Sequence, residues 1–407
     1  MQTTVCQFTL LKMPPRQYLQ GLLAIIFIAS TLCGKLAQVH AQPVRVETVA
    51  TGLQNPWGLA FLPEGRFLVT EKPGRLRVVD ADGKLGASVG GLPKIAAGGQ
   101  GGLLDVLLDA DFARNRQVYL CFSEPAATGN GNSNANSTAL ARASLSADNT
   151  RLENLKVIFS QQPKVASSAH FGCRIVESRA PGMGGQPDGK LFLTLGDRYS
   201  RKDDAQKLDN HHGKVIRINK DGSVPPDNPF VGKAGALPEV WSYGHRNLQG
   251  AVLAPDGALW THEHGPQGGD EINLPKAGAN YGWPVITYGE NYGGGKIGEG
   301  LTRQAGMEQP LHYWVPSIAP SGMAFLTSER YGKAWQGNLF VGSLKFGYLD
   351  RIELTRPYAG QVVGESKLMA ETGERIRDVR QGPDGLLYVL TDSSNGQLIR
   401  LLPDTVK

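Results

Sequence analysis

Cysteine is scarce in this sequence. Four cysteines occur in 407 residues, and two of them precede residue 42. No Cys-x-x-Cys pair is present, which argues against a zinc knuckle and against a redox dithiol. The remaining two, Cys121 and Cys173, either form a disulfide in an oxidising compartment or are separate small buried side chains. We favour the second interpretation.

Excess charge is also lacking. The formal net charge is +5, and Lys12, Arg16 and Lys35 supply three of these charges without any acid in the first 41 residues. The rest of the chain therefore carries about +2. A nearly neutral chain has no strong field that would attract polyanions, so we expect no nucleic-acid partner.

A long apolar run is missing as well. The run at residues 22–32 is too short for a membrane-spanning helix. Basic residues precede it and Val39-His40-Ala41 follows as a small-x-small exit, which predicts a signal peptide over residues 1–41. Leu32 stands before Cys33 where a lipoprotein has a small residue, so we expect no lipid anchor. The mature chain is expected in the periplasm or outside the cell, without an integral membrane segment.

Glycine, in contrast, is abundant at 52 residues, and it punctuates strand-like runs. Four Pro-acid-Gly triplets, which favour tight turns, begin at positions 63, 187, 255 and 383. Their spacings are multiples of about 64 residues, and similar runs from Gly101 and Ser321 occupy the gaps. Little helical periodicity is present. The pattern predicts an all-β, six-bladed β-propeller with four-stranded antiparallel blades over residues 42–407; seven blades or another β-barrel is the alternative.

The stretch "EHGPQGGDEINLPKAGANYGWP" combines flexible backbone with oxygen ligands. Gly265 and Pro266 can present two successive carbonyls, Asp270 and Glu271 add carboxylates, and Tyr281 lies ten residues further on. Calcium prefers six to eight such hard oxygens. A calcium site is one interpretation, and a glycine-rich loop with solvated acids is the other.

Several histidines are candidates for a metal site or for acid–base catalysis. His262 and His264 flank Glu263, but their spacing is not that of a helical zinc motif, and we expect a structural role for them. His211-His212 is expected to shape the turn before "GKVIRIN". His170 differs because it lies in the small-residue segment "SSAHFGCRIV", where an accessible ring can act as a general base.

Cationic and amide side chains recur at equivalent points of the repeat. They are Gln100, Arg246, Asn247, Lys345, Arg375 and Arg377. Each could be a solvated surface group. Arginine forks match carboxylates, however, and loops of all propeller blades converge on one end of the central channel. Taken together, these residues indicate a planar, polyanionic small molecule close to a metal ion.

These residues lie in motifs that resemble the soluble pyrroloquinoline-quinone (PQQ) sugar dehydrogenases, and the aldose sugar dehydrogenase branch most closely. The motifs are "YGHRNLQG", "HGPQGGDEINL" with "GANYGWP", and "RIRDV", and the resemblance runs over residues 56–401. It implies a six-bladed propeller that binds PQQ and Ca²⁺ and oxidises an aldose sugar to a lactone. Electrons then pass to an external acceptor.

The resemblance also implies roles for individual residues. Cofactor binding falls to Gln100, Arg246, Asn247, Lys345, Arg375 and Arg377. Proton abstraction falls to His170, with Arg246 stabilising developing charge. Calcium ligands are the carbonyls of Gly265 and Pro266, and a further calcium involves Glu271 and Tyr281, with Asp270 a weaker candidate.

One position departs from the glucose-oxidising branch. That branch has an aspartate directly before the catalytic histidine, whereas this sequence has Ala169. The imidazole could therefore be oriented differently. Trp314, in "HYWVPSIAPSG", is a candidate stacking platform for the sugar or, alternatively, a core residue.

Two other functions remain open on the sequence alone. A calcium-dependent lactonase or esterase can use the same propeller and the same polar loops. A non-catalytic carbohydrate- or protein-binding propeller can do so as well, because a fold alone does not select a function.

Overall fold

The computed structural model describes residues 44–127, 134–182 and 184–404. The predicted signal peptide, residues 1–41, lies outside the described residues. Within the part described, no helix is long and apolar enough to cross a membrane.

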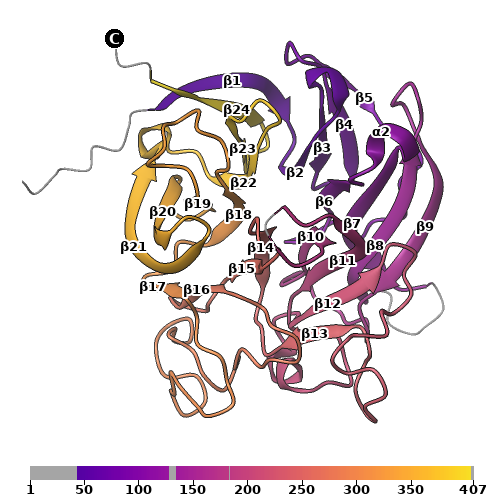
Figure 1. Ribbon diagram of the computed structural model, residues 1–407. Coiled ribbons are helices and arrows are strands. Elements are labelled where there is room, and N and C mark those ends of the chain that lie inside the picture. Colours follow the sequence, from indigo (N-terminus) through magenta and orange to yellow (C-terminus); the bar gives the residue numbers. More distant parts are fainter. Residues whose placement is uncertain (1–43, 128–133, 183, 405–407) are drawn as a thin grey trace, which may run out of the picture. The chain divides into compact units, whose positions relative to one another are not determined.

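Antiparallel sheets of four strands build the described structure, and there are six of them (Figure 1). Five blades follow the chain in order, each with its first strand innermost. The first consists of β2(Pro56–Phe61), β3(Phe67–Glu71), β4(Arg75–Val79) and β5(Leu85–Ser88), and the second of β6(Leu103–Leu108), β7(Gln117–Pro125), β8(Asn136–Leu145) and β9(Leu152–Ser160). The third consists of β10(Gly172–Arg179), β11(Pro187–Leu195), β12(Lys214–Asn219) and β13(Val240–Tyr243), the fourth of β14(Leu248–Leu253), β15(Leu259–Glu263), β16(Asp270–Asn273) and β17(His312–Trp314), and the fifth of β18(Pro320–Phe325), β19(Leu339–Ser343), β20(Leu349–Arg356) and β21(Ala359–Leu368).

The sixth blade joins the two ends of the described chain. Its order is β1(Val44–Leu53), β24(Gly396–Pro403), β23(Leu387–Thr391) and β22(Ile376–Gln381). The first strand is thus the outermost strand of the last blade, and Val46 pairs with Leu401. The predicted all-β, six-bladed propeller with four-stranded antiparallel blades is confirmed.

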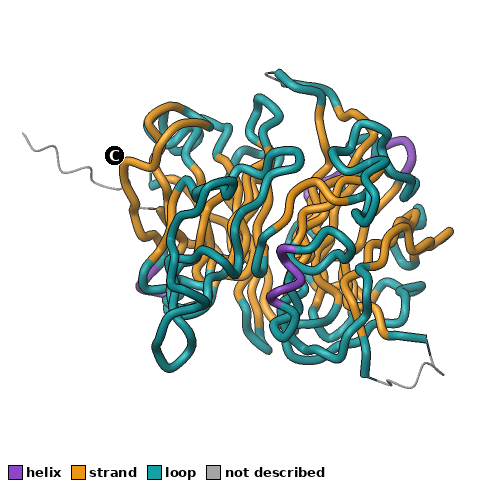
Figure 2. Tube along the Cα trace, turned by 90° about the horizontal axis from the view of Figure 1, so that it is seen from below, coloured by secondary structure: helices purple, strands orange, loops and turns teal. Residues whose placement is uncertain are grey.

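Helical structure in the described residues is limited to short turns (Figure 2): η1(Pro63–Gly65), α2(Phe112–Asn115), η2(Lys202–Gln206) and η3(Ala370–Thr372). The recurring Pro-acid-Gly triplets lie where the innermost strand of a blade connects to the second strand. Gly257, for example, donates its N–H to the Ala254 carbonyl at 2.9 Å and has φ 89°, a conformation that favours glycine.

A buried ionic network ties the innermost strands together at the centre. Arg174 of β10 contacts Asp105 of β6 and Asp378 of β22, both at 3.0 Å. Arg380 of β22 contacts the same two aspartates at 2.9 and 3.0 Å. Backbone groups of neighbouring innermost strands complete the network: the amides of Leu59 and Ile175 and the carbonyl of Gln249. The two arginines therefore balance the two aspartates, and the network connects the innermost strands of five blades, β2, β6, β10, β14 and β22.

Cys121 and Cys173 are bonded to each other, with their Cα atoms 5.7 Å apart. Both are fully buried, in β7 and β10 of adjacent blades. Our interpretation of two separate buried cysteines is therefore wrong. The sequence separation of 52 hides the fact that neighbouring blades bring the two strands side by side.

Replacing both cysteines by alanine is expected to lower the free energy of unfolding by about 2–4 kcal/mol, because the bond restricts the unfolded chain. Denaturant unfolding of protein starting at residue 42 measures the change. Thiol titration of the unfolded, unreduced protein is expected to find no free thiol. Two reactive thiols, or a double variant as stable as the parent, would contradict the pairing.

Candidate active site

A cavity of about 1010 Å³ lies where residues from all six blades meet. Five of the residues selected from the sequence line it: Gln100, Pro266, Lys345, Arg375 and Arg377. These residues are far apart in the chain, and the propeller brings them to one place. Three of the five, Lys345, Arg375 and Arg377, are cationic, so three of the selected cationic side chains do converge on one cavity.

The cationic wall of the cavity is held in shape by one carboxylate. Arg375 and Arg377 both donate to Asp392 Oδ2, at 3.0 and 2.9 Å. Burial works to raise the pKa of Asp392, but the charges of the two arginines outweigh it and lower that pKa to about 2. With Lys72 and Lys345, four cations line the cavity against two acids, Glu290 and Asp392. The surplus of positive charge suits an anionic ligand.

His170 lies directly before β10, with its ring held by a buried carboxylate. Its Nδ1–H donates to Asp197 Oδ1 at 2.6 Å, and its backbone N–H donates to Gln100 Oε1 at 2.8 Å. Asp197 also accepts the Trp283 Nε1–H at 2.8 Å and the Tyr199 N–H at 2.8 Å. Since Asp197 occupies Nδ1, Nε2 is the nitrogen that carries the free lone pair in neutral imidazole.

Burial favours the neutral form of this imidazole. Burial lowers the pKa of His170, Asp197 opposes that effect, and the charges of Arg246 and Arg198 add to it, so the pKa ends below the ordinary value. A neutral ring with one nitrogen anchored can accept a proton at the other.

Asp197 was not identified from the sequence as the partner of His170. The sequence shows only that Ala169, and not a carboxylate, directly precedes His170. The carboxylate comes instead from the segment after β11, "TLGDRYS", 27 residues further along the chain. The available signal was a polar residue two positions after the second strand of its blade, the same point of the repeat that Lys345 occupies after β19. The departure at Ala169 does not leave His170 without an orienting acid.

Arg246 and Asn247 lie beside the large cavity rather than on its wall. Arg246 Nη1 donates to the carbonyls of Gly265 and His264 at 2.7 and 3.1 Å. Asn247 Oδ1 accepts the Gly172 N–H at 3.2 Å. Among the described residues, Arg246 Nε and Asn247 Nδ2 are buried donors without a partner. Such donors are suited to an additional polar ligand.

The glycine-rich loop owes its form to close backbone contacts. A Cβ at Gly265 would lie 2.2 Å from the Gly268 carbonyl oxygen, so only glycine fits. Asp270 braces the loop: Oδ1 accepts the Gly265 N–H at 2.8 Å, and Oδ2 accepts from Ser317 Oγ and Ile318 N at 2.7 and 2.8 Å. Asp270 is therefore a structural carboxylate, which explains why it is the weaker candidate for a metal ligand.

A small cavity of about 10 Å³ adjoins the large one, since His264 lines both. Arg246, Gly265, Glu271 and Tyr281 line this small cavity. Burial, and then the neighbouring charge of Glu263, raises the pKa of Glu271 to about 8. Within the described residues, no group of three or more His, Cys, Asp or Glu side chains is arranged to hold a metal ion. A cation here would therefore need carbonyl oxygens as well.

Tyr281 can take part only through its main chain. Its hydroxyl donates to the Leu274 carbonyl and accepts the Lys276 N–H at 3.0 Å. Its ring stacks on His245 with the centroids 4.6 Å apart. The side chain is thus already committed within the protein.

Trp314 is 6% exposed and packs in an apolar cluster with Trp260 and Ile272. It does not line the large cavity. The structure thus shows the core residue and not the stacking platform, because β17 turns this ring toward the blade interior. Tyr288 and Tyr292 line the cavity instead and were not selected from the sequence.

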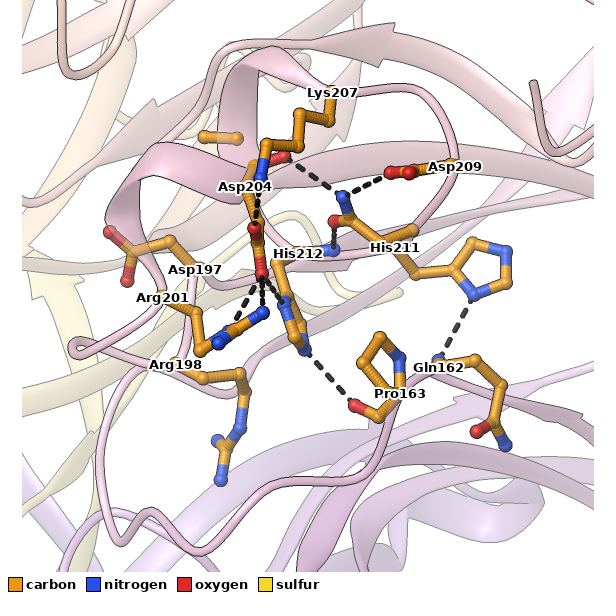
Figure 3. Close-up of polar contacts among 12 residues, drawn as sticks. Gln162, Pro163, Asp197, Arg198, Arg201, Asp204, Lys207, Asp209, His211 and His212 are labelled. Atoms are coloured by element: carbon orange, nitrogen blue, oxygen red, sulfur yellow. Dashed lines mark hydrogen bonds and ion pairs between the residues drawn. The ribbon is translucent and has the colours of Figure 1, made fainter. Parts of the chain in front are cut away.

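His264 and His212 have structural hydrogen-bond partners. His264 Nε2–H donates to the Pro320 carbonyl at 2.7 Å, and burial lowers the pKa of both His262 and His264 to about 3. Figure 3 shows His212 between Asp204 and Pro163, with each contact at 3.1 Å. These contacts agree with the roles expected for His264 and His212, whereas His262 is fully buried with no hydrogen-bond partner at either ring nitrogen among the described residues.

Comparisons with known proteins agree with this geometry. The family model for Glucose / Sorbosone dehydrogenase matches residues 53–400. The aldose sugar dehydrogenase YliI of Escherichia coli (strain K12) is 42% identical over 388 residues, which cover 94% of this chain and 98% of the relative.

Solved structures agree as well. A crystal structure of glucose dehydrogenase is 48% identical, with a TM-score of 0.80, over 88% of this chain and 99% of the other. The PQQ-bound aldose sugar dehydrogenase of Streptomyces coelicolor is 27% identical, with a TM-score of 0.69, over 88% of this chain and 99% of the other. The sequence match over most of its length and the shared propeller together establish that this chain belongs to the glucose/sorbosone dehydrogenase family.

Proposed function

We propose that the protein is a PQQ-dependent dehydrogenase that oxidises aldose sugars at the anomeric carbon to lactones and passes the electrons to an external acceptor. The observation that carries this proposal is the buried His170–Asp197 pair, whose neighbours Gln100 and Phe171 line a cavity with a cationic wall. The sugar-oxidising relatives and the PQQ-bound neighbour support it.

The residues present fit PQQ, a planar tricarboxylate. Lys345, Arg375 and Arg377 provide positive charge along the cavity, and Gln100 provides an amide. The unpartnered donors of Arg246 and Asn247 add capacity for oxygen atoms. When bound, PQQ supplies the two-electron acceptor that no side chain can provide.

His170 would act as the general base. With its Nδ1–H held by Asp197, its Nε2 accepts the proton of the anomeric hydroxyl, and Asp197 stabilises the resulting imidazolium. Arg246 holds a positive charge near the imidazole, where negative charge would develop on an oxygen. Burial favours the neutral form of the ring, which is the form that can accept this proton.

Calcium is the proposed metal. Pro266 lines the large cavity and Gly265 the small one, and their carbonyls are hard oxygens. The Gly265 carbonyl accepts from Arg246 Nη1 at 2.7 Å, so calcium would bind it in place of or beside that donor. In the small cavity, Glu271 and the Tyr281 main chain would hold a further ion, in a space of about 10 Å³ that suits one water-sized particle. A divalent cation would also relieve the repulsion between Glu271 and Glu263.

A periplasmic or secreted location fits the buried Cys121–Cys173 bond, because disulfides persist in oxidising compartments. Such a location would also place the enzyme near extracellular sugars and near a separate electron acceptor.

Reconstitution tests the function directly. Purified protein incubated with PQQ and Ca²⁺ is expected to oxidise a panel of aldoses with an artificial electron acceptor, and protein without PQQ is expected not to. Hydrolysis of lactones or esters without PQQ would instead indicate a lactonase. Sugar binding with no PQQ-induced absorbance change would indicate a binding module.

Replacing His170 by glutamine is expected to lower kcat by about 10²-fold, because the general base is lost. PQQ affinity should remain, and Asp197→Asn should lower kcat in the same direction. Steady-state kinetics and PQQ titration measure the two effects. His312→Gln, which removes a histidine paired with Glu365 at 2.8 Å outside the cavity, is the matched control. Unchanged turnover in His170→Gln would remove this residue from the mechanism.

Calcium is expected to raise the melting temperature of the PQQ-free protein, and chelation is expected to reverse the rise, because an ion that binds only the folded state stabilises it. Glu271→Gln should remove most of this increment. Glu308→Gln, which changes an acid paired with Lys276 at the surface, should keep it. An equal calcium increment in all three proteins, measured by differential scanning calorimetry, would argue against a site at Glu271.

A further inference from the structure

Arg198 is a buried cation without an acidic partner. Its exposed fraction is 0%, and within the described residues it forms no salt bridge. Burial lowers the pKa of Arg198 to about 9, and the charge of the adjacent Asp197 only partly opposes that effect. Neutral acceptors bind it instead, namely the Ala169 and Ser167 carbonyls and Asn136 Oδ1. Burying a charge without an acid bound to it is costly, so a guanidinium in this position calls for a functional explanation.

The guanidinium binds the backbone on the N-terminal side of His170 and stacks on the side chain that follows it. Nη1 donates to the Ala169 carbonyl at 2.8 Å, and Nη2 donates to the Ser167 carbonyl at 2.7 Å. On the other side of His170, the guanidinium carbon lies 3.6 Å from the centre of the Phe171 ring. Arg198 therefore contacts residues immediately before and immediately after the proposed base.

The backbone in this region is strained at three residues that are not glycine. His170 has φ 51°, Arg198 has φ 61° and Tyr199 has φ 64°, all in the left-handed region. Such conformations cluster at functional sites and persist only where surrounding contacts enforce them. Two contacts join the strained segments in addition to the guanidinium: Ser167 Oγ donates to the Arg198 carbonyl at 2.9 Å, and the His170 Nδ1–H donates to Asp197 Oδ1 at 2.6 Å. Within the second segment, the Tyr199 N–H donates to the same Asp197 oxygen at 2.8 Å.

We propose that Arg198 is a positioning residue for His170: its fork holds the backbone of Ser167 and Ala169 so that the imidazole Nδ1–H stays on Asp197. Asp197 and Arg198 have separate roles: Asp197 orients the imidazole ring of His170, and Arg198 holds the backbone that precedes His170. Only arginine has a planar fork that can reach two carbonyls and also stack on an aromatic ring. The consequence for turnover rests on the proposed function, whereas the geometry of the imidazole belongs to the free protein.

The test uses Arg198→Met and Arg198→Lys, with Arg351→Met as the matched control. Arg351 is also buried, at 2% exposure, and also stacks on an aromatic ring, 5.0 Å from the centre of Trp335, but it lies in β20. The first measurement is proton and nitrogen NMR of the His170 imidazole in the PQQ-free protein, where the Nδ1 proton bonded to Asp197 gives a downfield signal.

Arg198→Met is expected to shift or abolish this signal and, after reconstitution, to lower kcat by about 10²-fold, the scale of an ångström-sized misplacement. KM and PQQ affinity should change little. Arg198→Lys keeps the charge but loses the fork, and it should give a smaller NMR shift in the same direction. Arg351→Met should lower stability and leave both the signal and kcat unchanged.

An unchanged Nδ1 signal in either Arg198 variant would overturn the proposal, and so would an equal shift in Arg351→Met. If Arg198→Met does not fold, the signal of Arg198→Lys decides between the two outcomes. Absence of sugar oxidation in the wild type would instead count against the proposed function, and the NMR comparison would still test the role of Arg198.

Discussion

Four charged side chains at the centre of the ring, the buried Arg174, Asp105 and Asp378 and the partly buried Arg380, make the contacts on which the rest of the structure depends. They tie three innermost strands together and leave no net charge behind. Because a buried ion pair is stable only when every member is present, the network favours one arrangement of blades over others. Trp57 contacts both this network and the cavity wall. The guanidinium carbon of Arg174 lies 4.5 Å from the centre of the Trp57 ring, and that of Arg377 in the cavity wall lies 5.9 Å from it.

Much of the fold could be predicted from the sequence, because each blade repeats the same local chemistry. Proline, an acid and glycine mark the turns, and the strand-like runs on either side follow at a regular spacing. The pairing of β1 with β24 could not be read in this way, since no local signal tells a first strand to join the last blade. The Cys121–Cys173 bond was misjudged for the same reason, because it depends on contact between two blades.

The site was predictable where a residue acts through its own charge or backbone. Lys345, Arg375, Arg377, Gln100 and Pro266 do line one cavity. Residues that act by orienting another side chain could not be predicted. Asp197 is the clearest case, because its role depends on its hydrogen bond with a histidine 27 positions earlier in the chain. For Trp314 the sequence could not distinguish a binding residue from a core residue. A large aromatic residue in a loop-rich segment can be either, and only its burial in the structure shows that Trp314 belongs to the core.

The pairing of Val44 with Pro403 has a consequence for biosynthesis. Five blades can assemble as the polypeptide emerges, but the sixth must wait until almost the whole chain has been made. Until then, β1 is an open edge that presents unsatisfied amides and carbonyls to any other extended strand. The interval between the synthesis of β1 and that of β24 is therefore the period in which this protein is most exposed to misassembly with its own copies.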